Sequence, residues 1–361
     1  MLVGINKEIS KTKVAVAMSG GVDSSTVAAL LHHHGYKVIG ITLQLYDQGS
    51  INKKKGSCCA GQDIYDAKSV AEKLGIPHYV LNYQDRFKES VIDDFVDSYI
   101  KGETPTPCIK CNQSVKFEDL LNMAKDLHVD CLATGHYVQK IIKNQKAELH
   151  KGKDLNKDQS YFLFATTKKQ LNFLQFPIGE LDKKTTREYA KKFSLAVSDK
   201  PDSQDICFVN GSYADMIESI KPNAKKKGKI IHIDGYELGE HQGIINYTIG
   251  QRKGIKISFS YPLYVIKIDQ DKNIIYVGPE KHLYSNQFFL KDVNILCNTD
   301  ELLKKKIEVK IRYSNNPIAA NIIFENNKYK VLLKQPQKAI TKGQACVFYK
   351  GSKVLGGGWI N

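Results

Sequence analysis

Hydrophobic and polar positions follow two periodicities in the first third of the chain. An uninterrupted apolar run at 14–18 predicts a buried strand, and apolar residues at helical spacing between 27 and 31 predict a helix directly after it. The same patterns predict further strands at 38–45, 78–82 and 131–135, and helices at 64–74, 87–101 and 117–128. Strands that alternate with helices at this spacing indicate a parallel sheet covered by helices.

The pattern changes towards the C-terminus. A polar excursion is expected at 140–157, short helices at 161–164 and 186–193, and a basic link at 221–229. Short apolar strands separated by polar turns then follow, at 264–268, 274–277, 307–313, 319–324, 329–333 and 345–349. Many short strands of this kind predict a small β-barrel or sandwich.

Composition narrows the class of protein. A chain of 361 residues is expected to form two or three domains. It has no apolar run of the roughly 18–20 residues that span a bilayer and no apolar leader at its start, so we expect a cytoplasmic protein. The net charge of +15 favours a polyanionic partner, nucleic acid first. The alternative is a lysine-rich surface that reflects biased composition.

The glycine turn after the first strand is a candidate phosphate site. Ser19-Gly20-Gly21 lets the backbone take unusual dihedral angles, and the helix that opens at Asp23 adds unpaired amides. Neither the P-loop nor the dinucleotide-binding motif is present. The simpler alternative is a tight turn with Asp23 as N-cap. A second strand ends at 134–136, and the carboxyl ends of parallel strands meet at one edge of a sheet, so the two loops are expected to converge.

Eight cysteines in a cytoplasmic chain indicate catalysis or metal binding more than a disulfide framework. Cys108 and Cys111 form Cys-x-x-Cys in a proline-bearing loop before the helix expected near residue 116, where a thiolate is favoured. A zinc site would need a second such pair, and Cys58-Cys59 is adjacent rather than spaced. The sequence around the motif is also wrong for a thioredoxin-like pair.

The remaining cysteines and histidines have simpler explanations. Cys131 and Cys346 lie in apolar strands and are expected in the core, and Cys207 alone would be a structural cysteine. No role is assigned to Cys58-Cys59. The histidines at 32–34 are expected at a solvated helix end rather than at a metal.

Eight motifs, in order along almost the whole chain, resemble those of the tRNA-specific 2-thiouridylase family. The first, Ser-Gly-Gly-Val-Asp-Ser at 19–24, resembles the PP-loop of ATP pyrophosphatases. The others lie at 104–112, 133–137, 156–162, 202–208, 239–243, 248–254 and 310–313. The adenylating relatives of the PP-loop class, such as argininosuccinate, asparagine, GMP and NAD synthetases, lack the cysteine pair and the later motifs.

The resemblance implies an α/β fold in three parts. It predicts a PP-loop domain with a parallel sheet, similar to the adenine nucleotide alpha hydrolases, at 1–209. A small central domain is expected at 210–283 and a C-terminal β-barrel that binds tRNA at 284–361. The chain is expected to be a monomer.

The family reaction implies an ATP site. In it, ATP adenylates the 2-oxygen of the wobble uridine, and a cysteine persulfide then delivers sulfur. The residues implied to hold ATP are Ala15, Val16, Ala17, Met18, Ser19, Gly20, Gly21, Val22, Asp23, Ser24, Leu43 and Gly135. Asp23 is also expected to help place Mg²⁺.

The resemblance assigns Cys111 as the nucleophile and Cys207 as the carrier of the persulfide. It implies two partners, the anticodon arm of tRNA and a protein that donates sulfur. Residues implied to meet the target base or other parts of tRNA are Thr106, Pro107, Cys108, His136, Lys157, Asp158, Gln159, Arg312, Tyr313 and Gln344. A wobble base must leave its stack to reach such a pocket.

Two residues depart from the commoner family pattern. Thr106 stands where the family often has Asn, and Cys108 where some members have Asp. The second change creates the alternative that Cys108, Cys111 and Cys207 hold an iron–sulfur cluster with one open iron. The persulfide route is the first choice.

Overall fold

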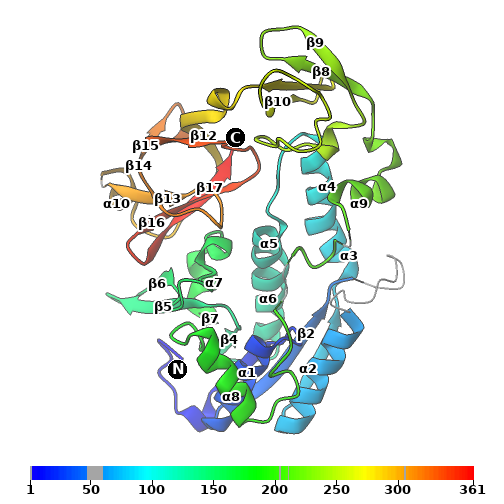
Figure 1. Cartoon of the computed structure of the whole chain (residues 1–361). Helices are drawn as coiled ribbons and strands as arrows, with labels where there is room; N and C mark the ends of the chain where they lie inside the picture. The colour runs from blue at the N-terminus through cyan, green and yellow to red at the C-terminus, as the bar shows by residue number, and fades with distance from the viewer. Residues whose placement is uncertain (1, 47–59, 203–204, 210, 305) are drawn as a thin grey trace. The chain divides into compact units, whose positions relative to one another are not determined.

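The computed structural model describes residues 2–46, 60–202, 205–209, 211–304 and 306–361 (Figure 1). Cys58 and Cys59 lie outside the described residues. The chain forms two compact units. The first consists of Met1–Val91, Cys108–Phe208 and Gly351–Leu355, and the second of Ile92–Pro107, Val209–Lys350 and Gly356–Asn361.

A five-stranded parallel sheet is the centre of the first unit (Figure 1). Its order is β3-β2-β1-β4-β7, and each neighbouring pair is parallel. The strands are β1 (Lys13–Ala17), β2 (Lys37–Gln44), β3 (His78–Asn82), β4 (Cys131–Ala133) and β7 (Leu174–Gln175). The predicted parallel sheet is therefore confirmed, although β7 was not predicted.

Helices pack on this sheet as the apolar spacing predicts. The helix α1 (Val22–His33) buries Val27, Ala28 and Leu31 in the core with β1, and it packs against α2 (Ala60–Leu74) and α8 (Lys183–Lys192). A 3-10 helix at Ser160–Leu163 and α7 (Lys168–Phe173) complete the described helices of the region after β4. The buried stripe on each helix supplies most of its stability.

Two predicted helices are interrupted by π-helical turns. The helix expected at 87–101 consists of α3 (Gln84–Phe87), a π-helix (Lys88–Ile92) and α4 (Asp93–Ile100). The helix expected at 117–128 is the last part of a longer one, which comprises α5 (Pro107–Lys110), a π-helix (Cys111–Asp119) and α6 (Leu120–Asp126).

The cysteine motif was predicted in a loop, and this was wrong. Cys108 and Cys111 lie on helical turns, because the helix begins at Pro107 rather than near residue 116. Proline suits the first turn of a helix, where its missing N–H has no partner to lose.

The polar excursion at 140–157 was also a wrong prediction. It contains a hairpin of β5 (Val138–Lys143) and β6 (Lys146–Lys151), and β6 pairs with Lys353 at the start of β17. Lys140 is buried in this hairpin whereas Ile141 and Ile142 are exposed, so the sequence does not show the usual strand pattern.

The second unit contains a small sheet preceded by the helix α9 (Tyr213–Ile220). The sheet has the order β10-β11-β8-β9 and is formed by β8 (Gly228–His232), β9 (Glu237–His241), β10 (Tyr264–Asp269) and β11 (Ile274–Gly278). Ile230, Val265 and Val277 form its buried core. The basic link expected at 221–229 overlaps the start of β8, because this strand begins at Gly228.

The last strands of the second unit form a closed six-stranded barrel, not a sandwich. They are β12 (Tyr284–Ile295), β13 (Ile307–Lys310), β14 (Ile318–Glu325), β15 (Lys328–Lys338), β16 (Ala345–Lys350) and β17 (Lys353–Ile360), with α10 (Thr299–Lys304) between the first two. Their order is β12-β15-β14-β13-β16-β17, and the pairing of β12 with β17 closes the barrel. Closure leaves no free sheet edge.

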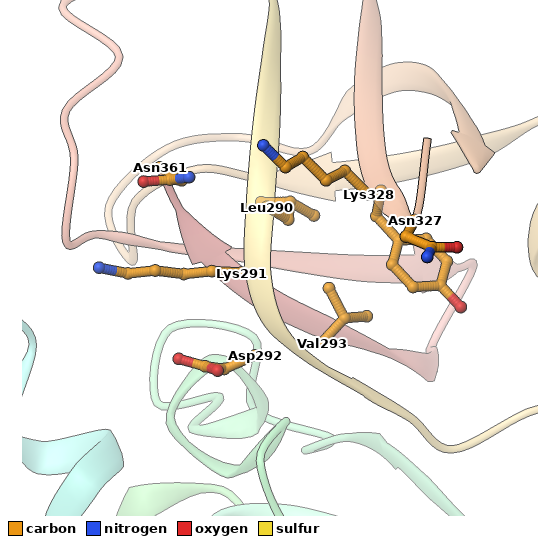
Figure 2. Close-up of a pocket in the computed structure, with 8 residues that line it drawn as sticks. Leu290, Lys291, Asp292, Val293, Asn327, Lys328 and Asn361 are labelled. Atoms are coloured by element: carbon orange, nitrogen blue, oxygen red, sulfur yellow. The ribbon is translucent and has the colours of Figure 1, made fainter. Parts of the chain in front are cut away.

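A shallow pocket of about 330 Å³ lies on the wall of this barrel (Figure 2). Residues 290–293 of β12, the turn at 327–329 and Asn361 line it. None of these is a predicted site residue. Within the part of the chain that the structure describes, no helix combines the length and apolarity needed to cross a bilayer.

Candidate functional site

The glycine turn lies between β1 and α1, at the carboxyl edge of the parallel sheet. Gly21, not Asp23, is the N-cap of α1, and no side chain caps this helix. Its first amides therefore remain available to an anionic ligand. The amide of Ser19 donates to Ser24 Oγ at 3.1 Å, which holds the turn closed.

The strand residues before the turn lie mainly in the core. Ala15, Val16 and Met18 are buried, whereas Ala17 and Leu43 are half-buried. The buried strand residues among those predicted to hold ATP therefore lie in the core that supports the glycine turn.

Two glycines are required by close contacts of the backbone. Gly20 has φ +72°, and a Cβ there would lie 2.1 Å from the carbonyl oxygen of Asp63. Gly135 follows β4 and packs on the start of α1, where a Cβ would lie 2.7 Å from the amide nitrogen of Ser24. The predicted convergence of the two strand-end loops is thus confirmed.

Asp23 is held by two side chains that sequence reasoning missed. Lys183 Nζ lies 2.8 Å from both Asp23 carboxylate oxygens, and Tyr137 Oη donates to Oδ1 at 2.8 Å. Lys183 also pairs with Asp202 Oδ1 at 2.7 Å. Their separations of 114 and 160 residues from Asp23 leave no local sequence signal.

The residues here do not fit a magnesium site. Both oxygens of Asp23 already accept hydrogen bonds, and Lys183 supplies the neutralising charge. Among the described residues, no group of three or more His, Cys, Asp or Glu side chains is arranged to hold a metal ion.

The first unit brings the two predicted catalytic cysteines into one neighbourhood. Cys111 is buried at the start of the π-helix, whereas Cys108 and Cys207 are exposed, and all three are free thiols. Although Cys207 as a residue is exposed, loss of hydration at its thiol group, then the charges of Cys111 and Cys108, raise its pKa to about 12. This mutual influence means that Cys207 lies near both.

Lys116 is the cation that faces these thiols. Burial raises the pKa of Cys108 and Cys111, and the charge of Lys116 opposes that rise at both. Lys116 lies five residues after Cys111 on the same π-helix, about one turn away. The neighbouring Phe117 packs edge-on against His136 at a centroid distance of 5.8 Å.

The alkylation of Cys207 by iodoacetamide is expected to depend steeply on pH. With a pKa of about 12, its thiolate fraction at neutral pH is about a thousandfold below that of an ordinary cysteine. The rate should rise throughout the accessible alkaline range. A Lys116→Met change removes a charge that lowers this pKa, so the rate at each pH should fall.

Peptide mass spectrometry of Cys207 at a series of pH values measures this rate. Lys125→Met, at an exposed position on α6, is the matched control and should leave the profile unchanged. A midpoint near that of free cysteine would contradict the assignment of a strongly perturbed thiol.

The predicted tRNA residues of the first unit are engaged within the fold. His136 is a neutral ring, because loss of hydration and then Lys116 lower its pKa to about 3. Lys157 pairs with Asp202 at 2.8 Å, and Gln159 Oε1 accepts from the Tyr137 amide at 2.9 Å.

Among the predicted tRNA residues of the first unit, Asp158 is the least accessible to a ligand. It is 6% exposed, and its carboxylate accepts from the Gly152 and Ser160 amides and from the Ser160 hydroxyl. Its role in the described structure is to hold the loop at 152–160 together.

Other predicted tRNA residues lie in the second unit. Gln344 Nε2 donates to the carbonyl of Thr104 at 2.8 Å, and so supports the segment that continues to Thr106 and Pro107. Thr106 Oγ1 is buried and has no hydrogen-bond partner among the residues that the structure describes, although a buried hydroxyl without one is costly.

The pair predicted on the barrel also lies in the second unit. Arg312 donates to the carbonyl of Ala339, and Tyr313 is 40% exposed beneath the ammonium group of Lys310. An exposed aromatic ring beside a cation is a suitable surface for stacking with a base.

Three family models match consecutive parts of the chain and define its class. They are the tRNA methyl transferase HUP domain at 12–211, the tRNA methyl transferase PRC-barrel domain at 215–279 and the aminomethyltransferase beta-barrel domain at 285–360. The class is therefore a HUP-domain protein, with the glycine turn at the edge of its parallel sheet, followed by two β-domains.

Comparison with curated relatives identifies the particular family. The chain is 59% identical over 361 residues to proteins named tRNA-specific 2-thiouridylase MnmA from Orientia tsutsugamushi (strain Boryong) and Rickettsia africae (strain ESF-5). Each match covers 99% of this chain and 98% of the relative. The chain belongs to the tRNA-specific 2-thiouridylase MnmA family.

Solved structures give only distant matches. A 4-thiouridine synthetase–RNA complex with bound ATP has a TM-score of 0.37 at 15% identity, covering 58% of this chain and 50% of that chain. NMN synthetase from Francisella tularensis has a TM-score of 0.34 at 19% identity, covering 54% and 67%. Similarity this low carries no argument about the site.

Proposed function

We propose that this protein uses ATP to convert the wobble uridine of tRNA to 2-thiouridine, with release of AMP and pyrophosphate. The observation that carries the proposal is that one compact unit contains both an uncapped glycine turn and two free thiols, Cys111 and Cys207. A carbonyl oxygen is a poor leaving group, and adenylation makes it a good one, so the two features belong to one reaction. The assignment to the MnmA family supports it.

The sulfur chemistry requires both thiols. A donor protein first loads Cys207 with a persulfide, whose terminal sulfur attacks C2 of the adenylated uridine and expels AMP. Cys111 then attacks the inner sulfur of Cys207, and the S–S bond to the uridine sulfur breaks. The electron pair of that bond remains on the uridine sulfur, which becomes the C=S group. The resulting Cys111–Cys207 disulfide must be reduced by an external dithiol.

The rest of the chain is assigned to substrate recognition. We propose domains at 1–209, 210–283 and 284–361, with the barrel gripping the anticodon arm mainly through phosphates. The orphaned hydroxyl of Thr106 and the exposed ring of Tyr313 support contacts with bases. The enzyme is proposed to act in the cytoplasm as a monomer.

Nucleoside mass analysis tests the function directly. The protein is incubated with unmodified tRNA, ATP, Mg²⁺, a persulfide donor and a dithiol, with and without oxygen. New 2-thiouridine under both conditions is expected, because the persulfide route needs no oxygen-sensitive group. Product only without oxygen would favour a cluster on Cys108, Cys111 and Cys207. Pyrophosphate release without 2-thiouridine would mean that the acceptor activated by ATP is not the wobble uridine. Binding of tRNA without any ATP-dependent reaction would mean that the protein is a tRNA-binding module and not an enzyme.

Binding of tRNA is expected to weaken steeply as salt is raised. The net charge of +15 allows several phosphate contacts, and each neutralised phosphate contributes about −0.7 to −0.9 to the slope of log K against log salt, because counterions are released. Filter binding of labelled tRNA at increasing KCl measures the slope. A flat response would mean that the basic surface is incidental to binding.

A further inference from the structure

An aromatic cluster lies at the end of β8 in the small sheet of the second unit (Figure 1). Its members are His232, Tyr236, Phe259 and Tyr261. His232 is the central ring, since it stacks on Tyr236 at a centroid distance of 4.6 Å and on Phe259 at 5.5 Å. Phe259 in turn meets Tyr261 edge-on at 4.8 Å. The four rings therefore form one continuous group.

Hydrogen bonds hold the central rings of this cluster in place. His232 is only 1% exposed, its Nδ1 accepts from the amide of Asp234 at 3.2 Å, and its Nε2 lies 3.0 Å from Tyr261 Oη. Tyr236 is fixed at the turn between β8 and β9, where its carbonyl accepts from the His232 amide at 2.8 Å. A ring that is already fixed loses little conformational entropy when a ligand stacks on it.

Two rings of the cluster are open to solvent. Tyr236 is 44% exposed and Tyr261 is 39% exposed. Because one face of Tyr236 is covered by His232, its exposed area lies on the other face and the edge. Single exposed aromatic residues are common on protein surfaces. A preformed stack that ends at the surface is instead suited to a further planar ring, such as a base.

Basic side chains precede these rings in the same segment of the chain. Residues 242–263 contain Arg252, Lys253 and Lys256 and no acidic side chain, and all three basic residues are exposed. Lys256 is three positions before Phe259, so their Cα atoms are at most about 11 Å apart. Proteins bind single-stranded RNA with this combination, because cations contact the phosphates and aromatic rings stack with the bases.

Acidic neighbours limit where a phosphate can lie. Asp234 Oδ2 is 3.2 Å from His232 Nδ1, at the turn between β8 and β9. Glu280 faces Arg252 and already pairs with Lys338 at 2.6 Å. A phosphate is therefore expected beside the lysines at 253 and 256 rather than at the turn or beside Glu280.

We propose that the aromatic cluster and the basic residues at 252–256 bind an unpaired nucleotide of tRNA. Its base stacks on Tyr236, and its phosphate contacts Lys253 and Lys256. The inference rests on the proposed function, because it takes tRNA as the ligand. The bound base is not the uridine that receives sulfur, since Cys111 and Cys207 belong to the first unit and the cluster to the second.

Filter binding of unmodified tRNA at a series of KCl concentrations tests this site. The proteins are wild type, Tyr236→Leu, Tyr236→Phe, Lys253→Met and Lys272→Met. Lys272 is the matched control for charge, because it is exposed in the turn that precedes β11. Since β8 and β11 are parallel, this turn lies at the opposite end of the sheet from His232, the last residue of β8.

Tyr236→Leu keeps an apolar side chain but removes the ring, so it should weaken tRNA binding at least about fivefold. The slope of log K against log salt should stay as in wild type, because no charge is lost. Tyr236→Phe keeps the ring and should bind as wild type does. Lys253→Met should instead make the slope shallower by about 0.7. Lys272→Met should change neither the affinity nor the slope.

Ultraviolet crosslinking of wild-type protein to the same tRNA gives a test that a folding defect cannot imitate. Peptide mass spectrometry should find the nucleotide on a peptide that contains Tyr236 or Phe259. Crosslinks confined to other peptides would overturn the proposal. Thermal unfolding of each variant shows whether a weaker affinity accompanies a loss of structure.

Equal affinity of Tyr236→Leu and wild type for tRNA would also overturn the proposal and leave the cluster as packing of the hairpin. An equal loss in Tyr236→Leu and Tyr236→Phe would assign binding to the hydroxyl rather than to stacking. Unchanged tRNA affinity with slower thiolation by a protein donor of sulfur would make the cluster a docking surface for that protein. If wild type bound no tRNA, the proposed function would fail as well. A wild type that forms 2-thiouridine, with Tyr236→Leu binding equally well, would refute this site alone.

Discussion

Replacement of Cys111 or Cys207 by serine is expected to abolish the formation of 2-thiouridine, by at least about a thousandfold in rate. A hydroxyl neither carries a persulfide nor attacks one at neutral pH. Binding of ATP should stay within about twofold of wild type, because the glycine turn and α1 use neither thiol. Nucleoside mass analysis and nucleotide calorimetry on the same preparations measure the two properties.

Cys108→Ser separates the two routes of sulfur transfer. Cys108 is exposed and lies near both other thiols, so it shares their environment. The persulfide route uses only two thiols and predicts that Cys108→Ser keeps most of the activity. A cluster route needs three ligands and predicts loss in all three variants. Loss of ATP binding in Cys111→Ser would contradict its role as a nucleophile and indicate a structural one.

The local part of the site could be predicted from the sequence because its signals lie close together. The apolar run of β1, the two glycines and the spacing in α1 fall within about twenty residues, and the structure preserves their order. Convergence with Gly135 followed from the topology of parallel strands, and the contact of Gly135 with the start of α1 confirms it.

The parts that were missed depend on distant contacts. Lys183 is 160 residues from Asp23, and Lys200 is 180 from Gly20, so no spacing rule connects them. The barrel strands β12 and β17 were overlooked although they pair with each other and close the sheet. Strand pairing across the chain, rather than a local pattern, stabilises such segments.

Gly20→Ala is expected to reduce ATP affinity by about a hundredfold or more and to lower stability. Its φ of +72° costs an L-residue about 1–2 kcal/mol, and the added Cβ would lie 2.1 Å from the Asp63 carbonyl oxygen. That atom belongs to the backbone of α2, so the turn must move instead. Calorimetry with an ATP analogue gives the affinity, and thermal unfolding gives the stability.

Two other glycines separate the effect of the turn from a general loss of stability. Gly61 lies in α2, and no atom of the described part of the chain lies within 4 Å of a Cβ added there, so Gly61→Ala should bind ATP normally and be up to about 1 kcal/mol more stable. Gly135→Ala would push against the amide nitrogen of Ser24, at 2.7 Å, and should weaken ATP binding as Gly20→Ala does. Normal ATP affinity in Gly20→Ala and Gly135→Ala would move the nucleotide site away from the turn. A Gly20→Ala protein that folds but does not bind ATP would place the nucleotide site at the glycine turn. In that variant the amides of α1 remain but no longer converge on the phosphates.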